Sequence, residues 1–314
     1  MDYKLLPVSI LIPTMNRPET LQRTLSTYLN TQYIPTQIVV VDQSREIGTQ
    51  IANKQLLDAY SNITECLYIH QDVPSLTKAR NIAFSACKEE IVICSDDDID
   101  AYEDTVKNVY DEMQDDSISM IAGLDDNLDW NNSPIGYFLG TRSYTKRNIG
   151  HVTKSMLGRY PDKVHGHVLT EWAMGYFFVI RRSLVNNWQL QWDEKLTSYA
   201  FSEDLDFSYA YYLRSRENRL KCILSEKVHV KHMASKEYRI STEKEVYMYV
   251  LNRAYLSEKF QQGIVGRLAC GWCNFWRLVQ SVIRKDNPQF LFFAILYLIR
   301  NREKVYSGIL DYSK

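Results

Sequence analysis

The sequence predicts an α/β fold, in which a mixed, mainly parallel sheet carries helices on both faces and a C-terminal helical extension follows. Three observations lead to this prediction. Short, continuous apolar runs recur through the first hundred residues, and segments of helical periodicity separate them. Runs that are apolar on both faces are typical of strands buried in a parallel sheet. After about residue 235 the strand-like runs stop and the pattern becomes helical.

The elements of the first hundred residues alternate along the chain. Val8 to Ile12 is a strand that ends at Pro13-Thr14, and Pro18 opens a helix. Next come a strand at 37–41, a helix through 51–57, a strand at 66–70, a helix at 76–87 and a strand at 90–94. Ligands of such sheets bind beyond the carboxyl ends of the strands. We therefore expect the residues at these ends to share one crevice, namely Thr14, Asp42, Asp72 and Asp96 to Asp98.

Asp96, Asp97 and Asp98 directly follow the strand at 90–94. Neighbouring carboxylates repel one another, so a cation or bulk water should meet them. Asp100 has a simpler explanation, because the stretch from Asp100 to Glu103 matches a capping box for a helix through Met113. Asp96 and Asp98 are alternate residues of an extended exit and share a face. They suit Mn²⁺ or Mg²⁺ holding a diphosphate.

The region after residue 235 is predicted to be helical. Residues 243–260 form one helix that ends at Gly263 and Gly266, and residues 268–283 form an aromatic helix. Asn287-Pro288 then precedes an apolar helix over residues 290–299, which basic residues follow. Aromatic and apolar helices flanked by Arg and Lys suit a membrane interface. Packing on the rest of the chain, or on a second copy as a homodimer, is the alternative.

Composition excludes several classes of protein. The 314 residues hold 37 Lys and Arg against 38 Asp and Glu, which leaves no general footprint for nucleic acid. The six cysteines are scattered, and Cys270-Gly271-Trp272-Cys273 is interpreted as a pair of buried thiols. No signal peptide is apparent, and the longest apolar run is too short to span a bilayer. We expect a cytoplasmic protein, with peripheral contact to the inner face of the membrane as a further expectation.

Several segments resemble the family 2 inverting glycosyltransferases of the GT-A fold, in the order in which that family has them. The donor half contains VSILIPTMNRP from residue 8, VVVDQS from 39, LTKARNIAFSA from 76 and IVICSDDDID from 91. The second half contains MGYFFVIRRSLV from 174, LQWDEKLTSYAFSEDLDFSYA from 190 and VHVKH from 228. The resemblance implies a catalytic domain over residues 1–235, with a nucleotide-sugar half at about 1–100 and an acceptor half at about 101–235. Residues 236–314 form the helical region.

The resemblance also implies roles for single residues. It assigns binding of the nucleotide-sugar donor to Pro13, Thr14, Asn16, Arg17, Asp42, Lys78, Arg80, Asp96 and Asp97. Asp98 and His232 would hold the metal, Asp204 would be the catalytic base, and Glu203 would orient the acceptor. His229 and His232 point to opposite faces if their segment is extended, so they are not expected to share an ion. The implied donor is a nucleotide-diphosphate sugar, preferably a UDP-sugar.

The acceptor implied by the resemblance is a glycan or a lipid-linked glycan, as in bacterial capsule or O-antigen assembly. A processive synthase is not expected, because the Q-x-x-R-W signature is missing. Two alternatives stay open. One is a non-catalytic relative that binds glycans or serves as a scaffold. The other is a sugar nucleotidyltransferase, although that class would carry a glycine-rich loop where this chain has Pro13-Thr14-Met15-Asn16.

Overall fold

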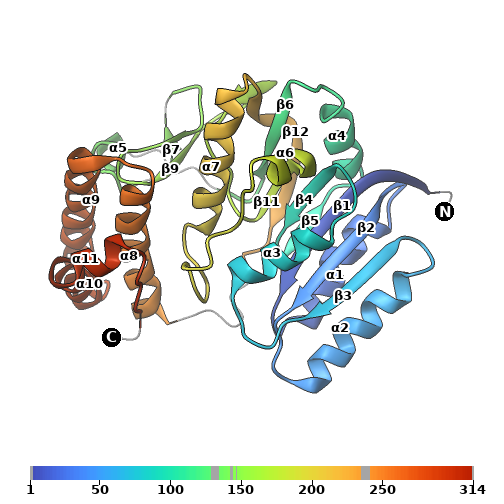
Figure 1. Cartoon of the computed structure of the whole chain (residues 1–314), viewed down its shortest axis with the longest axis horizontal. Coiled ribbons are helices and arrows are strands. Elements are labelled where there is room, and N and C mark those ends of the chain that lie inside the picture. Colours follow the sequence, from blue (N-terminus) through green and yellow to red (C-terminus); the bar gives the residue numbers. More distant parts are fainter. Residues whose placement is uncertain (1–2, 129–133, 142–143, 146, 235–240, 313–314) are drawn as a thin grey trace.

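The computed structural model describes residues 3–128, 134–141, 144–145, 147–234 and 241–312. Its first hundred residues alternate strands and helices, as predicted (Figure 1). The strands are β1 (Lys4–Thr14), β2 (Tyr33–Asp42), β3 (Glu65–His70) and β4 (Ile91–Ser95). The helices between them are α1 (Pro18–Leu29), α2 (Ile47–Tyr60) and α3 (Leu76–Ala86). The four strands are parallel, with β1 between β2 and β4, so their carboxyl ends lie at one edge.

The second half extends this sheet with strands of both directions. The added strands are β5 (Ile99–Ala101), β6 (Ile118–Asp125), β10 (His167–Leu169), β11 (Phe177–Arg181) and β12 (Lys221–His232). Across the described residues the strand order is β10-β12-β6-β11-β4-β1-β2-β3, and β5 pairs with β12. Strand β11 is antiparallel to both β4 and β6, whereas β12 is parallel to β6. The sheet is therefore mixed and mainly parallel in its first half, as predicted.

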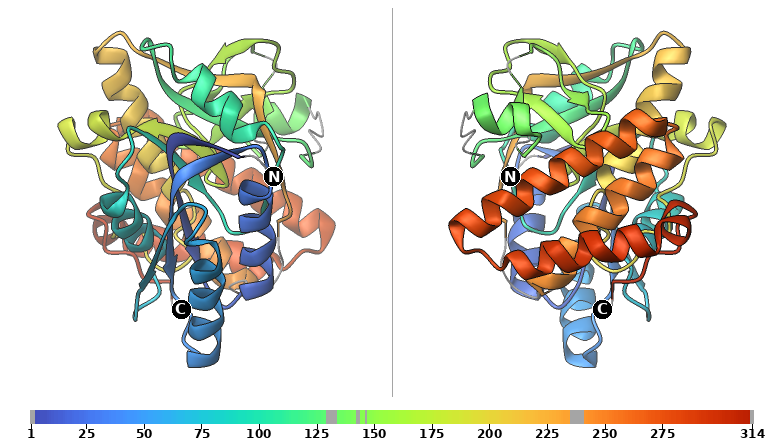
Figure 2. Two further views of the ribbon diagram at one scale, coloured as in Figure 1. Left: turned by 90° about the vertical axis from the view of Figure 1, so that its right-hand side faces the viewer. Right: turned by 90° about the vertical axis from the view of Figure 1, so that its left-hand side faces the viewer.

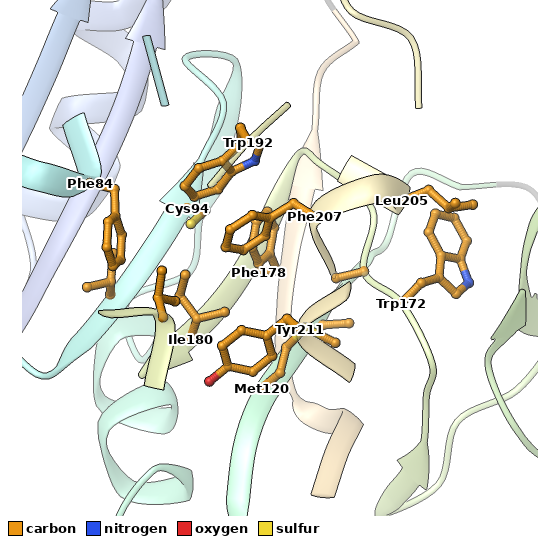
Figure 3. Packing of buried hydrophobic residues seen from close by; sticks show 14 of the residues in the cluster. Phe84, Cys94, Met120, Trp172, Phe178, Ile180, Trp192, Leu205, Phe207 and Tyr211 are labelled. Atoms are coloured by element: carbon orange, nitrogen blue, oxygen red, sulfur yellow. The ribbon is translucent and has the colours of Figure 1, made fainter. Parts of the chain in front are cut away.

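Helices cover both faces of the sheet. Helices α3, α6 (Arg182–Asn187) and α7 (Glu203–Glu217) contribute to the core on one face, and α1 and α4 (Thr105–Glu112) contribute to the core on the other. Figure 3 shows the aromatic packing of the first core, where the Trp192 ring stacks on Phe207 with centroids 3.8 Å apart. A smaller sheet is formed by β7 (Tyr144–Thr145), β8 (His151–Val152) and β9 (Gly158–Pro161), and α5 (Pro134–Leu139) precedes it.

One predicted helix start was wrong. Asp100 does not cap a helix, because it lies in β5 and its backbone is paired with Lys231 of β12. Helix α4 begins at Thr105, with Asp104 at the N-cap position. The Asp100 carboxylate instead forms an ion pair with Arg23 of α1. Sheet pairing with a strand more than a hundred residues away overrode the local capping signal, which sequence alone does not reveal.

The C-terminal part is helical, as predicted, and it forms a layer beside α7 (Figure 1; Figure 2, right). Its helices are α8 (Thr242–Lys259), α9 (Gly263–Arg284), α10 (Pro288–Arg300) and α11 (Arg302–Tyr306). The helix at 243–260 does end near the predicted position, but Gly263 is the first residue of α9 and Gly266 lies inside it, so residues 260–262 separate the first two helices. The predicted boundary at 235/236 falls outside the described residues. Among the described helices, none has the length and apolar character needed to cross a bilayer.

Helix α8 packs on the segment around α7. The Asn252 side chain donates to the carbonyl of Phe201 at 2.7 Å, and the Lys259 ammonium lies 2.7 Å from the Asp206 carboxylate. The alternative of packing on the rest of the chain therefore holds for α8. These contacts attach the helical layer to α7, whose first turn carries two of the predicted site residues.

Candidate active site

The three carboxylates that follow β4 have different surroundings. Asp97 is fully buried: the Thr14 hydroxyl donates to its Oδ2 at 2.6 Å, and Arg17 forms an ion pair with its Oδ1. The Thr24 hydroxyl also donates to the Asp97 backbone carbonyl. Burial raises the pKa of Asp97 to about 7, although Arg17 opposes the rise. Asp97 therefore ties the exits of β1 and β4 together, and its predicted contact with the donor stays a prediction.

Asp96, Asp98 and His232 form the group that can hold a metal. Their ligand atoms lie within 4.8 Å of one another, and His232 Nε2 is 3.3 Å from Asp98 Oδ1. The His232 ring stacks on Tyr176, with centroids 5.1 Å apart. Burial lowers the pKa of His232, but the Asp98, Asp96 and Asp125 carboxylates outweigh it, so the pKa is raised overall. Two carboxylates and one imidazole are a donor set that can bind a divalent cation.

The two histidines of β12 point to different partners, as the extended spacing predicts. His229 Nδ1 lies 2.8 Å from the Asp126 carboxylate, whereas His232 faces Asp98. His229 thus does not join the cluster around Asp96 and Asp98.

Arg80 is the only residue of the predicted pair on α3 that enters the site. Its Nη2 donates to Asp96 Oδ1 and to the Gly175 carbonyl, each at 2.9 Å, and its Nη1 lies 2.9 Å from Glu203 Oε1. The Arg80 side chain is almost completely buried. Lys78 is exposed, because a helix turns by about 200° over two residues and so places the two side chains on opposite faces. Contact of Lys78 with a nucleotide remains a prediction.

Glu203 and Asp204 begin α7. Asp204 accepts hydrogen bonds from the backbone N–H of Gly175 at 2.9 Å and of Leu205 at 2.8 Å. Burial raises the pKa of Asp204, and the two N–H donors oppose the rise. A Cβ at Gly175 would lie 3.1 Å from the Asp204 Cβ and 3.3 Å from Arg80 Nη2, so glycine permits this close approach. The geometry holds the Asp204 carboxylate in one orientation.

The turn before α7 has an unusual backbone. Ser198, Ala200 and Ser202 all have positive φ values, of 63°, 53° and 69°. Left-handed conformations are unfavourable for residues with a Cβ, and such strain concentrates at functional sites. Ser202 occupies the N-cap position of α7, but its side chain makes no capping bond. The turn instead brings Tyr199 and Phe201 to the wall of a cavity.

A cavity of about 410 Å³ brings the site together. Asp96, His232, Arg80, Glu203 and Asp204 line it, so residues from β4, β12, α3 and α7 meet there. The cavity is also lined by residues to which the sequence assigns no role of their own: Met156, Trp172, Met174, Tyr176, Phe201 and Arg253. Tyr176 lies within the MGYF segment that the sequence singles out. Arg253 belongs to α8, and no sequence signal pointed to it.

Asp42 lies at the end of β2 but is enclosed by the protein. Its carboxylate accepts from the Ser44 N–H and hydroxyl, from the Asn53 amide at 2.9 Å and from the Tyr68 hydroxyl at 2.9 Å. The side chain has no exposed surface. Contact of Asp42 with a base or ribose is therefore a prediction that this arrangement does not favour.

The other predicted donor residues lie around the exit of β1. Pro13 and Thr14 are buried, Arg17 is partly exposed, and Asn16 has a φ of 58°. The Asn16 N–H donates to the Ser44 hydroxyl at 2.8 Å, which joins this exit to that of β2. The predicted residues of β1, β2 and β4 are thus neighbours, as the sheet rule requires.

The fold and this site define an α/β protein of the GT-A type. Residues 9–187 match the sequence model of the protein family Glycosyl transferase family 2, so the chain belongs to that family. A search of the curated proteins gives no match.

Solved structures agree in fold. TarS 1–349 of S. aureus has a TM-score of 0.54 and 18% identity over 81% of this chain and 65% of its own, so this chain spans less than two thirds of it. The mannosyltransferase PcManGT from Pyrobaculum calidifontis, in complex with GDP-Man and Mn²⁺, has a TM-score of 0.56 and 13% identity over 98% and 87% of the two chains. GalNAc-T7 with UDP, GalNAc and Mn²⁺ has a TM-score of 0.56 and 19% identity over 85% and 54%.

Proposed function

We propose that this protein is a metal-dependent, inverting glycosyltransferase. It would move one sugar from a nucleotide-diphosphate donor, preferably a UDP-sugar, to a glycan or lipid-linked glycan, with Asp204 as general base. Membership of family 2 supports the reaction class. The UDP-, UDP-GlcNAc- and GDP-Man-bound relatives support the donor class. The observation that carries the proposal is that Asp96 and His232 line the same cavity as Asp204.

The residues of this chain fit that chemistry. Asp98 and His232, with Asp96, would hold Mn²⁺ or Mg²⁺, which would neutralise charge on the departing diphosphate. Asp204 would take the proton of the acceptor hydroxyl as its oxygen attacks the anomeric carbon. General-base catalysis is most effective when the pKa of the base lies near the pH of the reaction. Burial raises the pKa of Asp204 towards that range. Glu203, held by Arg80, would orient the acceptor beside Asp204.

Ligand-dependent stability tests the donor site. Thermal unfolding would be measured with UDP, GDP, CDP and dTDP, each with Mn²⁺ or with EDTA. The proposal expects one nucleotide to raise the midpoint temperature only when the metal is present, because a ligand that binds the folded state alone stabilises it. If no nucleotide does so, the scaffold alternative is favoured.

The Asp204→Asn variant tests the catalytic role. Its turnover should fall by about 10²–10⁴-fold, the usual contribution of general acid–base catalysis, while the nucleotide-dependent stabilisation persists. Unchanged turnover would remove Asp204 as the base. The anomeric configuration of the product, followed by NMR, distinguishes inversion from retention. Release of pyrophosphate in place of a nucleoside diphosphate would identify a sugar nucleotidyltransferase.

The outer surface of α9 supports peripheral contact with a membrane. Its exposed apolar residues recur at helical spacing and define what we term the apolar face: Ile264, Val265, Leu268, Trp272, Phe275, Val282 and Ile283. Two of the arginines of α9 make contacts within the chain: Arg277 stacks on Tyr249 of α8, and Arg267 pairs with Glu258. A surface helix normally shows solvent its polar side. The apolar outer face of α9 thus differs from a usual surface helix and suits a covering partner.

Charge favours an anionic lipid surface as that partner. The ends of α9, α10 and α11 carry exposed basic residues, namely Arg284, Lys285, Arg300, Arg302 and Lys304, against the acids Asp286 and Glu303. Exposed Phe292 and Phe293 of α10 add aromatic area. Basic residues beside an aromatic and apolar helix are the features of interfacial anchors. We therefore propose that the protein acts at the inner face of a bacterial membrane, on lipid-linked precursors of surface polysaccharides such as capsule or O-antigen.

A further inference from the structure

Arg253 of α8 is a buried cation at the wall of the catalytic cavity. Its exposed fraction is 1%, and its Nε donates to the Ser155 carbonyl at 2.9 Å. Within the part of the chain that the structure describes, Nη1 and Nη2 have no hydrogen-bonded oxygen or nitrogen. The end of the guanidinium, which carries four N–H donors, therefore lacks an oxygen acceptor.

The groups around Arg253 do not neutralise its charge. The Tyr249 ring lies 4.6 Å from the guanidinium carbon. The neighbours that favour the charged form are Tyr249 and the thiols of Cys270 and Cys273, and the Cys273 thiol also forms a hydrogen bond with the guanidinium. Thiols are weak acceptors. Arg277 stacks on the same Tyr249 ring at 3.9 Å, which brings a second positive charge to this region.

Arg80 is a second arginine at this cavity that is buried to the same degree, and it has acidic partners. Its guanidinium is paired with the carboxylates of Asp96 and Glu203. Burying a charge without a partner is costly in proteins, so the place of Arg253 at the cavity wall calls for a partner that would offset this cost. Among the described residues, no carboxylate is close enough to Arg253 to form an ion pair with it.

We propose that Arg253 binds an oxyanion of the acceptor, either a phosphate or a carboxylate. The planar fork of an arginine matches both groups and can bind either one in a bidentate manner. The assignment to the acceptor rests on the proposed function. The assignment follows from where Arg253 lies. It contacts Ser155, Tyr249 and Cys273, which belong to other segments than the metal-binding group at the end of β4 and of β12.

The oxyanion has two chemical sources. A lipid-linked acceptor carries a phosphate or diphosphate beside its first sugar, and an acidic glycan carries the carboxylate of a uronic acid. Inorganic pyrophosphate and glucuronate are suitable probes for the two, with glucose as the neutral control. All three would be added to the full-length protein in EDTA, so that no divalent metal draws pyrophosphate to Asp98 and His232.

Thermal unfolding of the wild type and of Arg253→Met tests the proposal. One anion should raise the midpoint temperature of the wild type, glucose should not, and Arg253→Met should lose the shift. Without ligand, Arg253→Met should melt at the wild-type temperature or above it, because an unpaired buried charge has been removed. A purely structural arginine would instead leave a variant of lower midpoint temperature.

Two further variants complete the experiment. Arg267→Met, on the neighbouring helix and paired with Glu258, should keep the full shift. Arg253→Lys keeps the positive charge but lacks the planar guanidinium, so it should retain a reduced shift of the midpoint temperature. This variant also tests the proposal if the methionine variant does not fold. Absence of a shift with both anions in the wild type, or a full shift in Arg253→Met, overturns the proposal. Stabilisation by UDP with Mn²⁺ should survive in Arg253→Met, so failure of the donor site is seen separately.

Discussion

Arg80 Nη1 lies 2.9 Å from Glu203 Oε1, while Nη2 of the same guanidinium lies 2.9 Å from Asp96. One buried side chain of α3 thus joins the acid that follows β4 to the acid that begins α7. These two acids belong to the predicted donor side and acceptor side of the site. The position of Glu203 relative to Asp96 and the group that can hold a metal therefore depends on Arg80.

Replacing Arg80 by methionine should destabilise the protein by about 3–5 kcal/mol, because Asp96 and Glu203 would lose their buried partner. Arg80→Lys should not restore the wild-type stability, since one ammonium cannot replace a planar fork that reaches both acids. Urea unfolding at neutral pH measures both effects. Arg267→Met is the matched control, because its pair with Glu258 lies at the surface, and it should unfold as the wild type does. Equal stability of Arg80→Met and wild type would contradict a linking role.

Stability should fall with rising pH because of Glu203. Burial raises the pKa of Glu203 from 4.5 to about 8, and Arg80 only partly opposes this. Between these values the folded protein holds a proton that the unfolded chain has released, so the free energy of unfolding decreases as pH rises through that range. Glu203→Gln cannot titrate and should show a flatter profile. Midpoint temperatures of both proteins, measured from pH 4.5 to 8.5, give the comparison, and parallel profiles would refute the expectation.

Removing the proposed metal ligand should weaken Mn²⁺ binding. His232→Gln should lower the affinity by about tenfold or more, given that even outer-shell partners of a metal contribute 10- to 100-fold. Titration calorimetry with Mn²⁺ in the presence of UDP measures the change. His229→Gln is the matched control on the same strand, since His229 faces Asp126 and not the cluster. A similar loss of Mn²⁺ affinity in both variants would show that His232 affects binding only by supporting the structure of β12, and not as a ligand.

Acidic substitutions on the apolar face should release the protein from membranes. Leu268→Asp combined with Trp272→Asp should reduce binding to vesicles of phosphatidylglycerol and phosphatidylcholine several-fold, with little change in midpoint temperature because both side chains are exposed. Ile47→Asp, an equally exposed apolar position on α2, should bind as the wild type does. Co-sedimentation measures binding, and light scattering measures mass. If the wild type is a dimer and the double variant is a monomer, the apolar face is covered by a second copy of the chain and not by a lipid surface.

The parallel half of the fold could be predicted from the sequence, because its signals are local. A continuous apolar run followed by Pro, Asp or Ser marks a buried strand and its end, and the ends of parallel strands must meet. Thr14 and Asp97 are neighbours for this reason. Asp100 shows the limit, since its capping pattern was outweighed by pairing between β5 and the distant β12.

The sequence by itself determined the family, the alternation of strands and helices in the first hundred residues, and which residue types could carry the chemistry. Tertiary structure decided which of those residues face the cavity. It enclosed Asp97 and Asp42 among donors, turned Lys78 to solvent, and brought Arg253 from α8 to the cavity wall. The physical reason is the distance along the chain over which each kind of interaction acts. Periodicity and strand ends are set by neighbouring residues, whereas the partner of a buried charge is set by contacts between segments far apart in the chain.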